Sequence, residues 1–348
     1  MRAVTVTPGT GGSAALEELA EPSEDQGPVL VETIAVGICG TDLEISSGEY
    51  GWAPPGHKRL VLGHESIGKV TSAPSGSGLD PGDLVVGIVR RPDPVPCYSC
   101  ARGEWDFCRN GRYVEHGIKE LDGFMRERYR AEPDDLVRID EKLGPLGVLL
   151  EPTSVVAKAW EQAERVGNRA YWQPRTAVVT GAGPIGLLAA LLGVQRGLEV
   201  HVIDQVTDGI KPELVHDLGA HYHRGAIPDA CKDPDVILEC TGVGTLVFDA
   251  IEHIGPGGVV CLTGVSPVGR NLDVDAGLAN RTMVLGNEGV VGSVNANRRH
   301  YELAATALSR ADQAWLARLI TRRVPLDRFA EALVRQPDDV KVVLEVGA

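Results

Sequence analysis

The chain has no long hydrophobic run and few cysteines for its 348 residues, and each shortage excludes a class of protein. Its longest apolar stretch, 185–194, has about half of the ~20 residues that a membrane-spanning helix needs. The opening segment MRAVTVTPGTGG has no apolar signal-peptide core, so we expect a cytoplasmic protein without a membrane partner. Seven cysteines are an odd number and thinly spread, which argues against a disulfide framework and leaves metal ligands or free thiols.

Positive charge is also in short supply. The chain has 34 Lys and Arg against 48 Asp and Glu, a formal net charge of −14. Phosphate backbones are bound by clustered Lys and Arg, so nucleic acid is not an expected partner. A composition of 43% hydrophobic and 24% charged residues is that of a soluble globular protein. At about 150 residues per domain, the length predicts two domains.

The residue pattern changes near Leu150. Before it, short segments rich in Val, Ile and Thr alternate with Gly and Pro and predict an irregular β-rich unit, as at 29–36, 66–71 and 83–89. After it, a helix at 151–163 precedes a strand, a helix and a strand within 177–204. The alternation continues with strands at 235–239, 258–263 and 290–294 and a helix at 246–253, which predicts a doubly wound parallel sheet. The tail predicts helices at 301–308 and 315–321 and a strand near Val324.

Gly181, Gly183 and Gly186 form the sequence G-A-G-P-I-G between the first of these strands and its helix. In a dinucleotide-binding fold the first glycine permits a tight turn, the second lets the backbone approach the pyrophosphate, and the third lets helix and strand pack closely. The helix N-terminus adds free N–H groups and a positive dipole for phosphate. The simpler alternative is an ordinary tight turn between strand and helix.

Asp204 lies 18 residues beyond Gly186, at the end of the second strand. A carboxylate there accepts hydrogen bonds from ribose hydroxyls and repels a 2′-phosphate. Gln205 and Val206 follow it, and neither is a cation that could receive such a phosphate. We therefore expect NAD to be favoured, with NADP as the alternative cofactor. In the simpler interpretation Asp204 is a helix-capping or solvated carboxylate.

Four residues offer a ligand set for zinc: Cys39, His64, Glu65 and Glu151. A thiolate, an imidazole and a carboxylate can bind zinc and leave a position open for water or substrate, as a catalytic site requires. Each residue alone has a simpler interpretation. Cysteine is often a small buried residue, histidine is often a hydrogen-bonded core residue, and Glu151 could cap the helix that follows it.

Several strings resemble the zinc-dependent medium-chain dehydrogenases: C-G-T-D from Cys39, G-H-E-S-I-G from Gly63, P-G-D-L-V from Pro81 and G-A-G-P-I-G. Within that superfamily, EHGI at 115–118, LDGFMRE at 121–127 and EPTSVVAKAWE at 151–161 resemble the archaeal-type glucose 1-dehydrogenases. The resemblance implies a GroES-like, β-rich catalytic domain at 1–152 and 296–348. It also implies a Rossmann dinucleotide-binding domain at 153–295 and assembly into a homodimer or homotetramer.

The resemblance assigns roles to individual residues. Cys39 and His64 would bind the catalytic zinc, and Glu65 and Glu151 would enter or leave its coordination shell. Thr41 would hydrogen-bond the substrate hydroxyl and relay its proton. Sugar hydroxyls would be contacted by Thr41, Glu115, Glu151 and Asn295. The cofactor would be bound by Gly181, Gly183, Pro184, Ile185, Gly186, Asp204, Gln205, Thr241, Thr263, Val265, Val294 and Asn295.

The chain departs from its relatives at two places. A structural zinc is held in that superfamily by four cysteines, of which Cys97, Cys100 and Cys108 are present while Pro94 occupies the first position. Asp93 could supply a substitute oxygen ligand, or the loop could be held by packing without metal. The second departure is Val155, where some sugar-oxidising relatives carry an acid. An apolar side chain there leaves one sugar hydroxyl without a partner, which can cost discrimination of ~10²-fold or more.

The sequence thus predicts an enzyme that transfers hydride from an aldose such as glucose, or from a related polyhydroxy alcohol, to NAD(P) with the help of Zn²⁺. Another alcohol, polyol or aminocyclitol dehydrogenase of the same superfamily is the alternative within enzymes. A metal-free nucleotide-binding sensor or structural protein is the alternative from another class.

Overall fold

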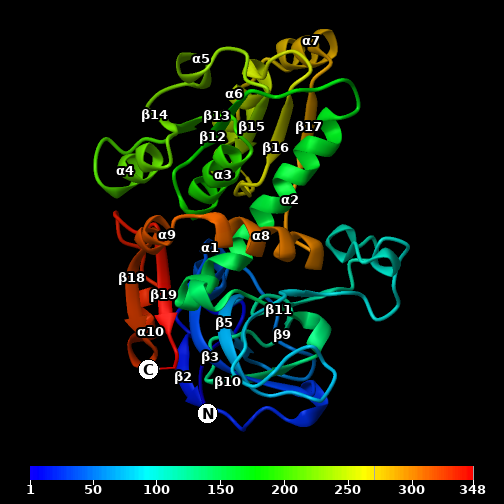
Figure 1. Ribbon diagram of the computed structural model, residues 1–348, viewed down its shortest axis with the longest axis vertical. Coiled ribbons are helices and arrows are strands. Elements are labelled where there is room, and N and C mark those ends of the chain that lie inside the picture. The colour runs from blue at the N-terminus through cyan, green and yellow to red at the C-terminus, as the bar shows by residue number, and fades with distance from the viewer. Residues whose placement is uncertain (270, 348) are drawn as a thin grey trace. The chain divides into compact units, whose positions relative to one another are not determined.

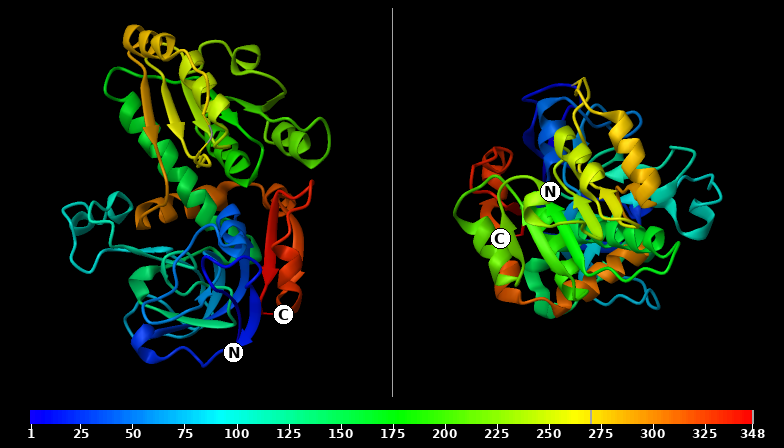
Figure 2. Two further views of the ribbon diagram at one scale, coloured as in Figure 1. Left: turned by 180° about the vertical axis from the view of Figure 1, so that it is seen from behind. Right: turned by 90° about the horizontal axis from the view of Figure 1, so that it is seen from above.

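The computed structural model describes residues 1–269 and 271–347. The chain divides into two compact units (Figures 1 and 2). Unit 1 comprises Met1–Glu151 and Ala296–Ala348, and unit 2 comprises Pro152–Asn295. Within the described ranges, none of the helices has the length and apolar character needed to cross a membrane.

Unit 1 consists mainly of β-strands. Its largest sheet contains β3 (Val29–Ile38), β5 (Glu65–Ser72), β6 (Leu84–Gly87), β10 (Arg128–Ala131), β11 (Leu136–Arg138), β18 (Ile320–Pro325) and β19 (Lys341–Glu345). The strand order is β11-β6-β5-β3-β19-β18, and β10 also pairs with β3. Two smaller sheets contain β1 (Arg2–Val6), β2 (Ala15–Glu18) and β4 (Leu60–Val61), and β7 (Arg90–Arg91), β8 (Val114–His116) and β9 (Glu120–Leu121).

The register around β3 brings distant parts of the chain together. β3 is antiparallel to β5, with Gly37 opposite Glu65. It is also antiparallel to β19, with Ile38 opposite Val342. A Cβ atom at position 37 would collide with Glu65 Oε2, so glycine is required where the Glu65 side chain crosses the strand. The carboxyl end of β3 therefore lies between the start of β5 and the start of β19.

The α-helices of unit 1 have between four and thirteen residues. They are α1 (Gly40–Ser47), α8 (Arg298–Arg310), α9 (Gln313–Leu319) and α10 (Phe329–Ala332), with 3₁₀ turns at Glu24–Gln26, Cys100–Arg102, Trp105–Phe107, Pro133–Asp135, Glu141–Leu149 and Leu326–Arg328. The sequence predicts a helix over 315–321, but α9 ends at Leu319 and β18 begins at Ile320. The β-branched residues Ile320 and Thr321 fit a strand, and pairing with β19 decides the switch.

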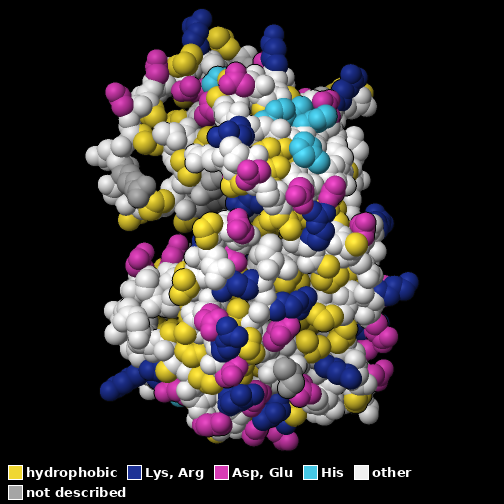
Figure 3. Space-filling model, turned by 90° about the vertical axis from the view of Figure 1, so that its left-hand side faces the viewer, with side chains coloured by type: hydrophobic (Ala, Val, Ile, Leu, Met, Phe, Trp, Pro, Cys, Tyr) yellow, Lys and Arg dark blue, Asp and Glu magenta, His cyan; other side chains and the backbone are white. Residues whose placement is uncertain are grey.

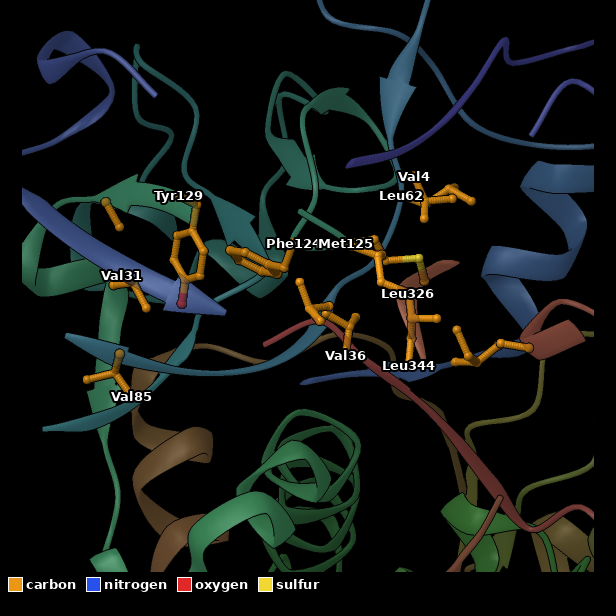
Figure 4. Packing of buried hydrophobic residues seen from close by; sticks show 14 of the residues in the cluster. Val4, Val31, Val36, Leu62, Val85, Phe124, Met125, Tyr129, Leu326 and Leu344 are labelled. Carbon is orange, nitrogen blue, oxygen red and sulfur yellow. The ribbon is translucent and has the colours of Figure 1, made fainter. Parts of the chain in front are cut away.

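The hydrophobic core of unit 1 lies against the largest sheet of this unit (Figure 4). Phe124 lies between Tyr129 and Met125 in that view, and all three side chains are at most 1% exposed. The rings of Phe124 and Tyr129 have centroids 4.7 Å apart. Burying a large apolar side chain contributes roughly 1.5–3 kcal/mol, so this packing holds the strands that carry the site.

Unit 2 is a doubly wound parallel sheet, as the sequence predicts. Its strands are β12 (Thr176–Thr180), β13 (Glu199–Ile203), β14 (His221–His223), β15 (Val236–Glu239), β16 (Val259–Leu262) and β17 (Gly289–Gly292). Its helices are α2 (Leu150–Gly167, which begins in unit 1), α3 (Pro184–Gln195), α4 (Ile210–Asp217), α5 (Ile227–Ala230), α6 (Gly244–His253) and α7 (Ala276–Gly286). The strands lie in the order β14-β13-β12-β15-β16-β17. From β12 the chain adds strands on one side as far as β14, and from β15 it adds them on the other side. Such sheets bind nucleotides at this switch point, between β12 and β15.

The last strand of unit 2 is shorter than the sequence predicts. β17 ends at Gly292 rather than at Val294. The carbonyl of Val294 accepts a hydrogen bond from Lys158 Nζ, at 2.9 Å, instead of pairing with a strand. Lys158 is a buried residue of α2, and its side chain fixes the segment after β17. The helical pattern of the sequence does not single out this lysine.

Candidate functional site

Three of the four proposed zinc ligands converge in unit 1. Cys39, His64 and Glu65 each offer a ligand atom, and these atoms lie within 4.8 Å of one another. Cys39 directly follows β3 and caps α1, while His64 directly precedes β5. The antiparallel pairing of β3 with β5 places these positions side by side. His64 and Glu65 are buried, and Cys39 is half-buried.

Asp42 links two of these residues from behind. It lies in the first turn of α1 and is fully buried. Its Oδ2 accepts the main-chain N–H of Cys39 at 2.9 Å, and its Oδ1 lies 3.5 Å from His64 Nδ1. Burial alone would lower the pKa of His64, but Asp42 and Cys39 outweigh it and raise that pKa well above the usual value. A carboxylate behind an imidazole orients the ring and makes its other nitrogen a better metal ligand.

Glu65 is held by a buried lysine. Lys341 Nζ lies 2.8 and 2.6 Å from the two carboxylate oxygens of Glu65 and donates to the carbonyl of Ile38 at 3.2 Å. Both charged side chains are 2% exposed. Burial works against the charge on Lys341, but Glu65, Cys39 and Glu151 outweigh it and raise the pKa of Lys341. Glu65 would have to leave this lysine in order to bind a metal through the same oxygens.

Glu151 and Thr41 complete the predicted catalytic set. Glu151 is buried at the start of α2 and is not one of the three residues whose ligand atoms converge within 4.8 Å. Burial, helped by the nearby carboxylates Glu65 and Asp42, outweighs the opposing charges of His64 and Lys341 and raises the pKa of Glu151 to about 7. Thr41 lies two residues beyond Cys39, in the first turn of α1, with its Oγ1 4.0 Å from Cys39 Sγ. The side chain of Thr41 is therefore close to the converging ligands.

This donor set suits zinc. Thiolate, imidazole and carboxylate are the ligand types that zinc takes in proteins, and a buried second carboxylate behind the imidazole is typical of such sites. With Nδ1 of His64 facing Asp42, Nε2 is the nitrogen that would face a metal. Cys39 and His64 would hold the ion, and Glu65 and Glu151 would be available as oxygen ligands.

The predicted sugar contacts lie in different surroundings. Glu115, on β8, is buried, and its Oε1 accepts from Arg90 Nε and Nη2, each at 3.0 Å. The Arg90 guanidinium lies over the Tyr113 ring, 3.7 Å from its centroid. Asn295 has φ +62° and is the last residue of unit 2. Sequence reasoning missed Arg90, which fixes the orientation of Glu115.

The glycine motif has the geometry that the sequence predicts. β12 ends at Thr180, Gly181 turns the chain with φ +87°, and Gly183 caps α3. A Cβ atom on Gly186 would collide with the carbonyl oxygen of Gly181, while one on Gly183 would meet no atom within 4 Å. Pro184 and Ile185 open α3. The turn therefore requires glycine at 186 and leaves space at 183, next to a helix N-terminus that suits phosphate.

Asp204 organises the turn. Its Oδ2 accepts the main-chain N–H of Ala182 at 2.6 Å, and its Oδ1 accepts those of Gln205 and Val206 at 2.7 and 3.2 Å. Lys211 Nζ lies 3.8 Å from Asp204 Oδ2. The sequence indicates no cation at this position, because Lys211 is separated from Asp204 along the chain and comes near it only through α4.

The other predicted cofactor residues follow the carboxyl ends of β15, β16 and β17. Thr241 and Thr263 are held by Glu239, which is fully buried at the end of β15. The Glu239 carboxylate accepts from the hydroxyls of Thr180 and Thr241 and from the N–H groups of Thr241 and Gly242. The Glu239 carbonyl accepts from the Thr263 hydroxyl at 2.9 Å. Val265 and Val294 have exposed side chains.

Three residues that sequence reasoning missed were marked by buried charge. Lys341 begins an apolar strand, Glu239 ends one, and Asp42 lies within the C-G-T-D string. A charged residue inside a buried segment signals a partner elsewhere, since such groups are rarely buried unpaired. The sequence could have singled out Lys341 and Glu239 on this ground, but not their partners.

The three cysteines of the incomplete lobe also converge. Cys97, Cys100 and Cys108 have sulfur atoms within 4.8 Å of one another. Main-chain N–H groups of Arg109 and Cys100, each 3.5 Å from Cys97 Sγ, lower the pKa of Cys97 to about 6. Burial raises the pKa of Cys100 to about 11.

The proposed fourth ligand of the lobe, Asp93, is engaged elsewhere. Its Oδ1 accepts the N–H of Val95 at 2.8 Å, and its Oδ2 accepts from Asn110 Nδ2 at 2.8 Å and Arg112 Nε at 3.3 Å. The remaining cysteines, Cys231, Cys240 and Cys261, are free thiols of unit 2.

Two family models match the chain. Residues 25–141 match the alcohol dehydrogenase GroES-like domain. Residues 144–346 match the glucose dehydrogenase C-terminus. Together the two matches include the proposed zinc ligands and the proposed cofactor-binding residues.

Similar proteins of full length support the same family. Glucose 1-dehydrogenase of Methanocella arvoryzae is 38% identical over 359 aligned positions that cover 100% of both chains. Glucose 1-dehydrogenase of Thermoproteus tenax is 41% identical and covers 99% of both. A solved structure of Haloferax mediterranei glucose dehydrogenase, in complex with NADP, Zn and gluconolactone, has a TM-score of 0.92 at 32% identity, with 100% of both chains covered.

Proposed function

The chain belongs to the glucose dehydrogenase family of zinc-dependent medium-chain dehydrogenases, and from this premise we propose that it oxidises the anomeric hydroxyl of an aldose, with NAD as the favoured acceptor. It is a zinc- and NAD(P)-dependent dehydrogenase acting on CH–OH groups. The observation that carries the proposed site is the convergence of Cys39, His64 and Glu65 at the end of β3.

Different residues of the chain are proposed to bind the zinc, the substrate hydroxyl and the cofactor. Cys39 and His64 hold the zinc, which when bound acts as a Lewis acid and lowers the pKa of the substrate hydroxyl. Asp42 fixes the His64 ring. Thr41 accepts a hydrogen bond from the substrate hydroxyl and passes its proton on. The glycine turn and the Glu239-held threonines bind the nicotinamide cofactor, which accepts the hydride. Oxidation of the anomeric carbon yields a lactone.

Glu115 and Asn295 are proposed to recognise sugar hydroxyls. Glu115 is presented at a fixed angle by Arg90, and a rigid carboxylate discriminates hydroxyl positions better than a mobile one. Val155 is half-buried on α2. Because an apolar side chain at this position cannot hydrogen-bond a hydroxyl, a polyol or aminocyclitol with one hydroxyl fewer in this region is the second candidate substrate.

Asp204 supports the preference for NAD, because its carboxylate repels a 2′-phosphate. Lys211, 3.8 Å away, partly offsets this charge and provides for NADP as a second cofactor. Replacing Lys211 with Gln should therefore raise KM for NADP by several-fold and leave KM for NAD within about twofold. The Lys211 and Asp204 side chains are 12% and 14% exposed, and loss of one charge of such a pair is worth on the order of 1 kcal/mol. Equal changes for both cofactors would contradict this role.

The deciding experiment is a steady-state assay of the purified protein with a panel of aldoses, polyols and cyclitols and with both cofactors. Aldose oxidation that is abolished by a zinc chelator and restored by Zn²⁺ is the expected result. Preferential oxidation of a polyol or cyclitol would select the second candidate. If chelation and zinc content changed the rate of oxidation of none of the substrates, the proposed zinc site would be contradicted.

The proposal includes a cytoplasmic location and assembly into a homodimer or homotetramer. β17 supports the latter, because it is one of the two outer strands of the parallel sheet of unit 2 and offers an edge for pairing. Light scattering coupled to size exclusion measures the assembly directly.

A further inference from the structure

Two aromatic side chains, Tyr50 and Trp52, are exposed in the loop that follows α1. Tyr50 is 42% exposed and Trp52 is 46% exposed, and their rings meet edge to face with centroids 5.0 Å apart. Single exposed apolar side chains are ordinary on a protein, and Figure 3 shows them interspersed with charged side chains on one face of the molecule. Two large rings in contact form a broader apolar surface, which we call the aromatic pair.

The main chain of Trp52 is hydrogen-bonded to the turn between β8 and β9. Its N–H donates to the carbonyl of Ile118 at 2.9 Å, and its carbonyl accepts from the N–H of Glu120 at 3.0 Å. The turn begins at Glu115, whose carbonyl accepts from the N–H of Ile118 at 3.1 Å. One turn therefore carries the Glu115 carboxylate, which is proposed to recognise a sugar hydroxyl, and holds the aromatic pair beside it.

The turn and the aromatic pair pack on the two segments that carry proposed zinc ligands. A Cβ atom on Gly117, in the turn, would lie 2.4 Å from the carbonyl oxygen of Gly63, the residue before His64. A Cβ atom on Gly51, between the two aromatics, would lie 3.1 Å from side-chain atoms of Ile45 in α1, the helix that a proposed zinc ligand caps. Close approach of the main chain at these two glycines therefore brings the aromatic pair and the turn to the region of the zinc ligands.

The Tyr50 hydroxyl lies within electrostatic reach of Glu115. Burial is the largest cause that raises the pKa of Tyr50, the Glu115 carboxylate raises it further, and Arg90 opposes them. The Arg90 guanidinium and Lys119 Nζ lie 3.7 and 4.3 Å from the centroid of the Tyr113 ring, so cations already engage this third aromatic. The surroundings thus offer a fixed carboxylate for hydroxyls and an exposed aromatic surface next to it, a combination typical of small-molecule sites.

A six-membered sugar ring has a polar edge and an apolar face. The hydroxyls at its edge need hydrogen bonds, whereas the C–H groups of the ring face need an apolar surface. We propose that this face of the substrate stacks on the aromatic pair while Glu115 binds a hydroxyl at the edge. The substrate class is then a ring-closed aldose, an aldopyranose, and an open-chain polyol is disfavoured. The inference rests on the proposed function and adds to it a surface, Tyr50 and Trp52, that determines specificity.

Stacking on the aromatic pair contributes to binding and not to the chemical step. The ring stays closed from the aldose to the lactone, so the contact is equally strong before and during hydride transfer. Such an interaction lowers KM and leaves kcat unchanged. An aromatic contact of this kind is worth about three- to tenfold in affinity. An open-chain polyol such as D-sorbitol has no ring face and gains little from the aromatic pair.

The test compares the zinc-loaded wild type with Trp52→Ala, Trp52→Phe and the control Tyr171→Ala, which removes an aromatic of unit 2 that is 89% exposed. Trp52→Ala keeps the main-chain hydrogen bonds of this position and should raise KM for D-glucose about three- to tenfold, with kcat and KM for NAD within about twofold. Trp52→Phe should restore most of the lost affinity, because a phenyl ring keeps an aromatic face. The control should match wild type in all three constants.

Saturation-transfer NMR detects the contact without turnover. Irradiating the aromatic protons of the protein should transfer magnetisation to the ring C–H protons of D-glucose in wild type and control, less in Trp52→Ala, and less to D-sorbitol. Where Trp52→Ala does not fold, Tyr50→Ala carries the test. An enzyme that shows this transfer but oxidises no aldose would contradict the proposed function alone. Unchanged KM for D-glucose with equal transfer in wild type and Trp52→Ala would overturn the aromatic pair as the sugar surface, as would equal rises in KM for D-glucose and NAD.

Discussion

The two cysteine clusters of unit 1 are built in opposite ways. Cys39 and His64 meet because two long strands are paired, and Lys341 joins them from a strand that lies 276 residues beyond Glu65 along the chain. Cys97, Cys100 and Cys108 meet within one loop of twelve residues, numbered 97–108. The first cluster depends on the whole sheet, and the second depends on local turns.

The groups that stabilise the two clusters differ as well. Around the first, Asp42 and Lys341 are buried charged side chains that contact a ligand directly. Around the second, main-chain N–H groups face Cys97, and the carboxylate of Asp93, the predicted fourth ligand, is occupied by Asn110 and Arg112. A cluster backed by buried charges is expected to be sensitive to single substitutions, while one backed by main-chain groups is expected to tolerate them.

The largest contrast is expected from removing one sulfur from each cluster. Cys39→Ser should lower kcat/KM by about 10³- to 10⁴-fold, since it removes a ligand of the ion that polarises the substrate. Cys97→Ser should change kcat/KM by less than about threefold, the range of a surface loop substitution within ±0.5 kcal/mol. Steady-state kinetics and zinc analysis of both proteins measure this. Comparable losses of activity would mean that the lobe also supports catalysis.

A second contrast compares one ion pair from each cluster. Lys341→Met leaves the Glu65 carboxylate buried without its partner, which should cost about 3–5 kcal/mol of folding free energy. Arg112→Met removes the partner of Asp93, but the Arg112 side chain is 63% exposed, so the cost should be at most about 1 kcal/mol. Urea unfolding of the two variants gives both values. A small cost for Lys341→Met would show that water reaches Glu65.

The sequence predicted the parts of the site that lie in short motifs, and it missed the parts that depend on strand register. Cys39, His64 and the glycine turn are found in contiguous strings, and the parallel sheet follows from alternating strand and helix patterns. Lys341 pairs with Glu65 only because β19 lies next to β3. Likewise, the end of α9 at Leu319 depends on the pairing of β18, which helical periodicity does not contain.

A third contrast concerns the carboxylate behind each cluster. Asp42→Asn should reduce zinc affinity or activity by about 10- to 100-fold, because it removes the negative charge that orients the imidazole of His64. Asp93→Asn keeps one oxygen acceptor, for the N–H of Val95, and loses the one that serves Asn110 and Arg112. Because these partners belong to the cysteine lobe, the effect on catalytic zinc should be below threefold. Competition with a zinc chelator ranks the affinities. Equal affinities in the two variants would remove Asp42 from the support of His64.

The smallest effect is expected from a second ion pair on the strands that carry Lys341. Arg322 of β18 lies 2.7 Å from Asp339, just before β19, and their side chains are 17% and 8% exposed. Burial raises the pKa of Asp339, but hydrogen bonds from Arg322 and the N–H of Gln336 outweigh it and lower that pKa below 3.8. A carboxylate with a lowered pKa stabilises the fold above its unfolded pKa and loses this contribution as the pH falls through the folded value.

Asp339→Asn should therefore lower the unfolding free energy by at most about 1 kcal/mol at pH 7, and the difference from wild type should shrink as the pH falls below about 4. Urea unfolding of the two proteins at pH 7, 5 and 3.5 measures this difference. A difference that grew towards acid pH would require a raised pKa for Asp339. A cost as large as that of Lys341→Met would mean that depth of burial does not set the difference between these two pairs, and that the sheet edge at β18 is as sensitive to charge as the zinc site.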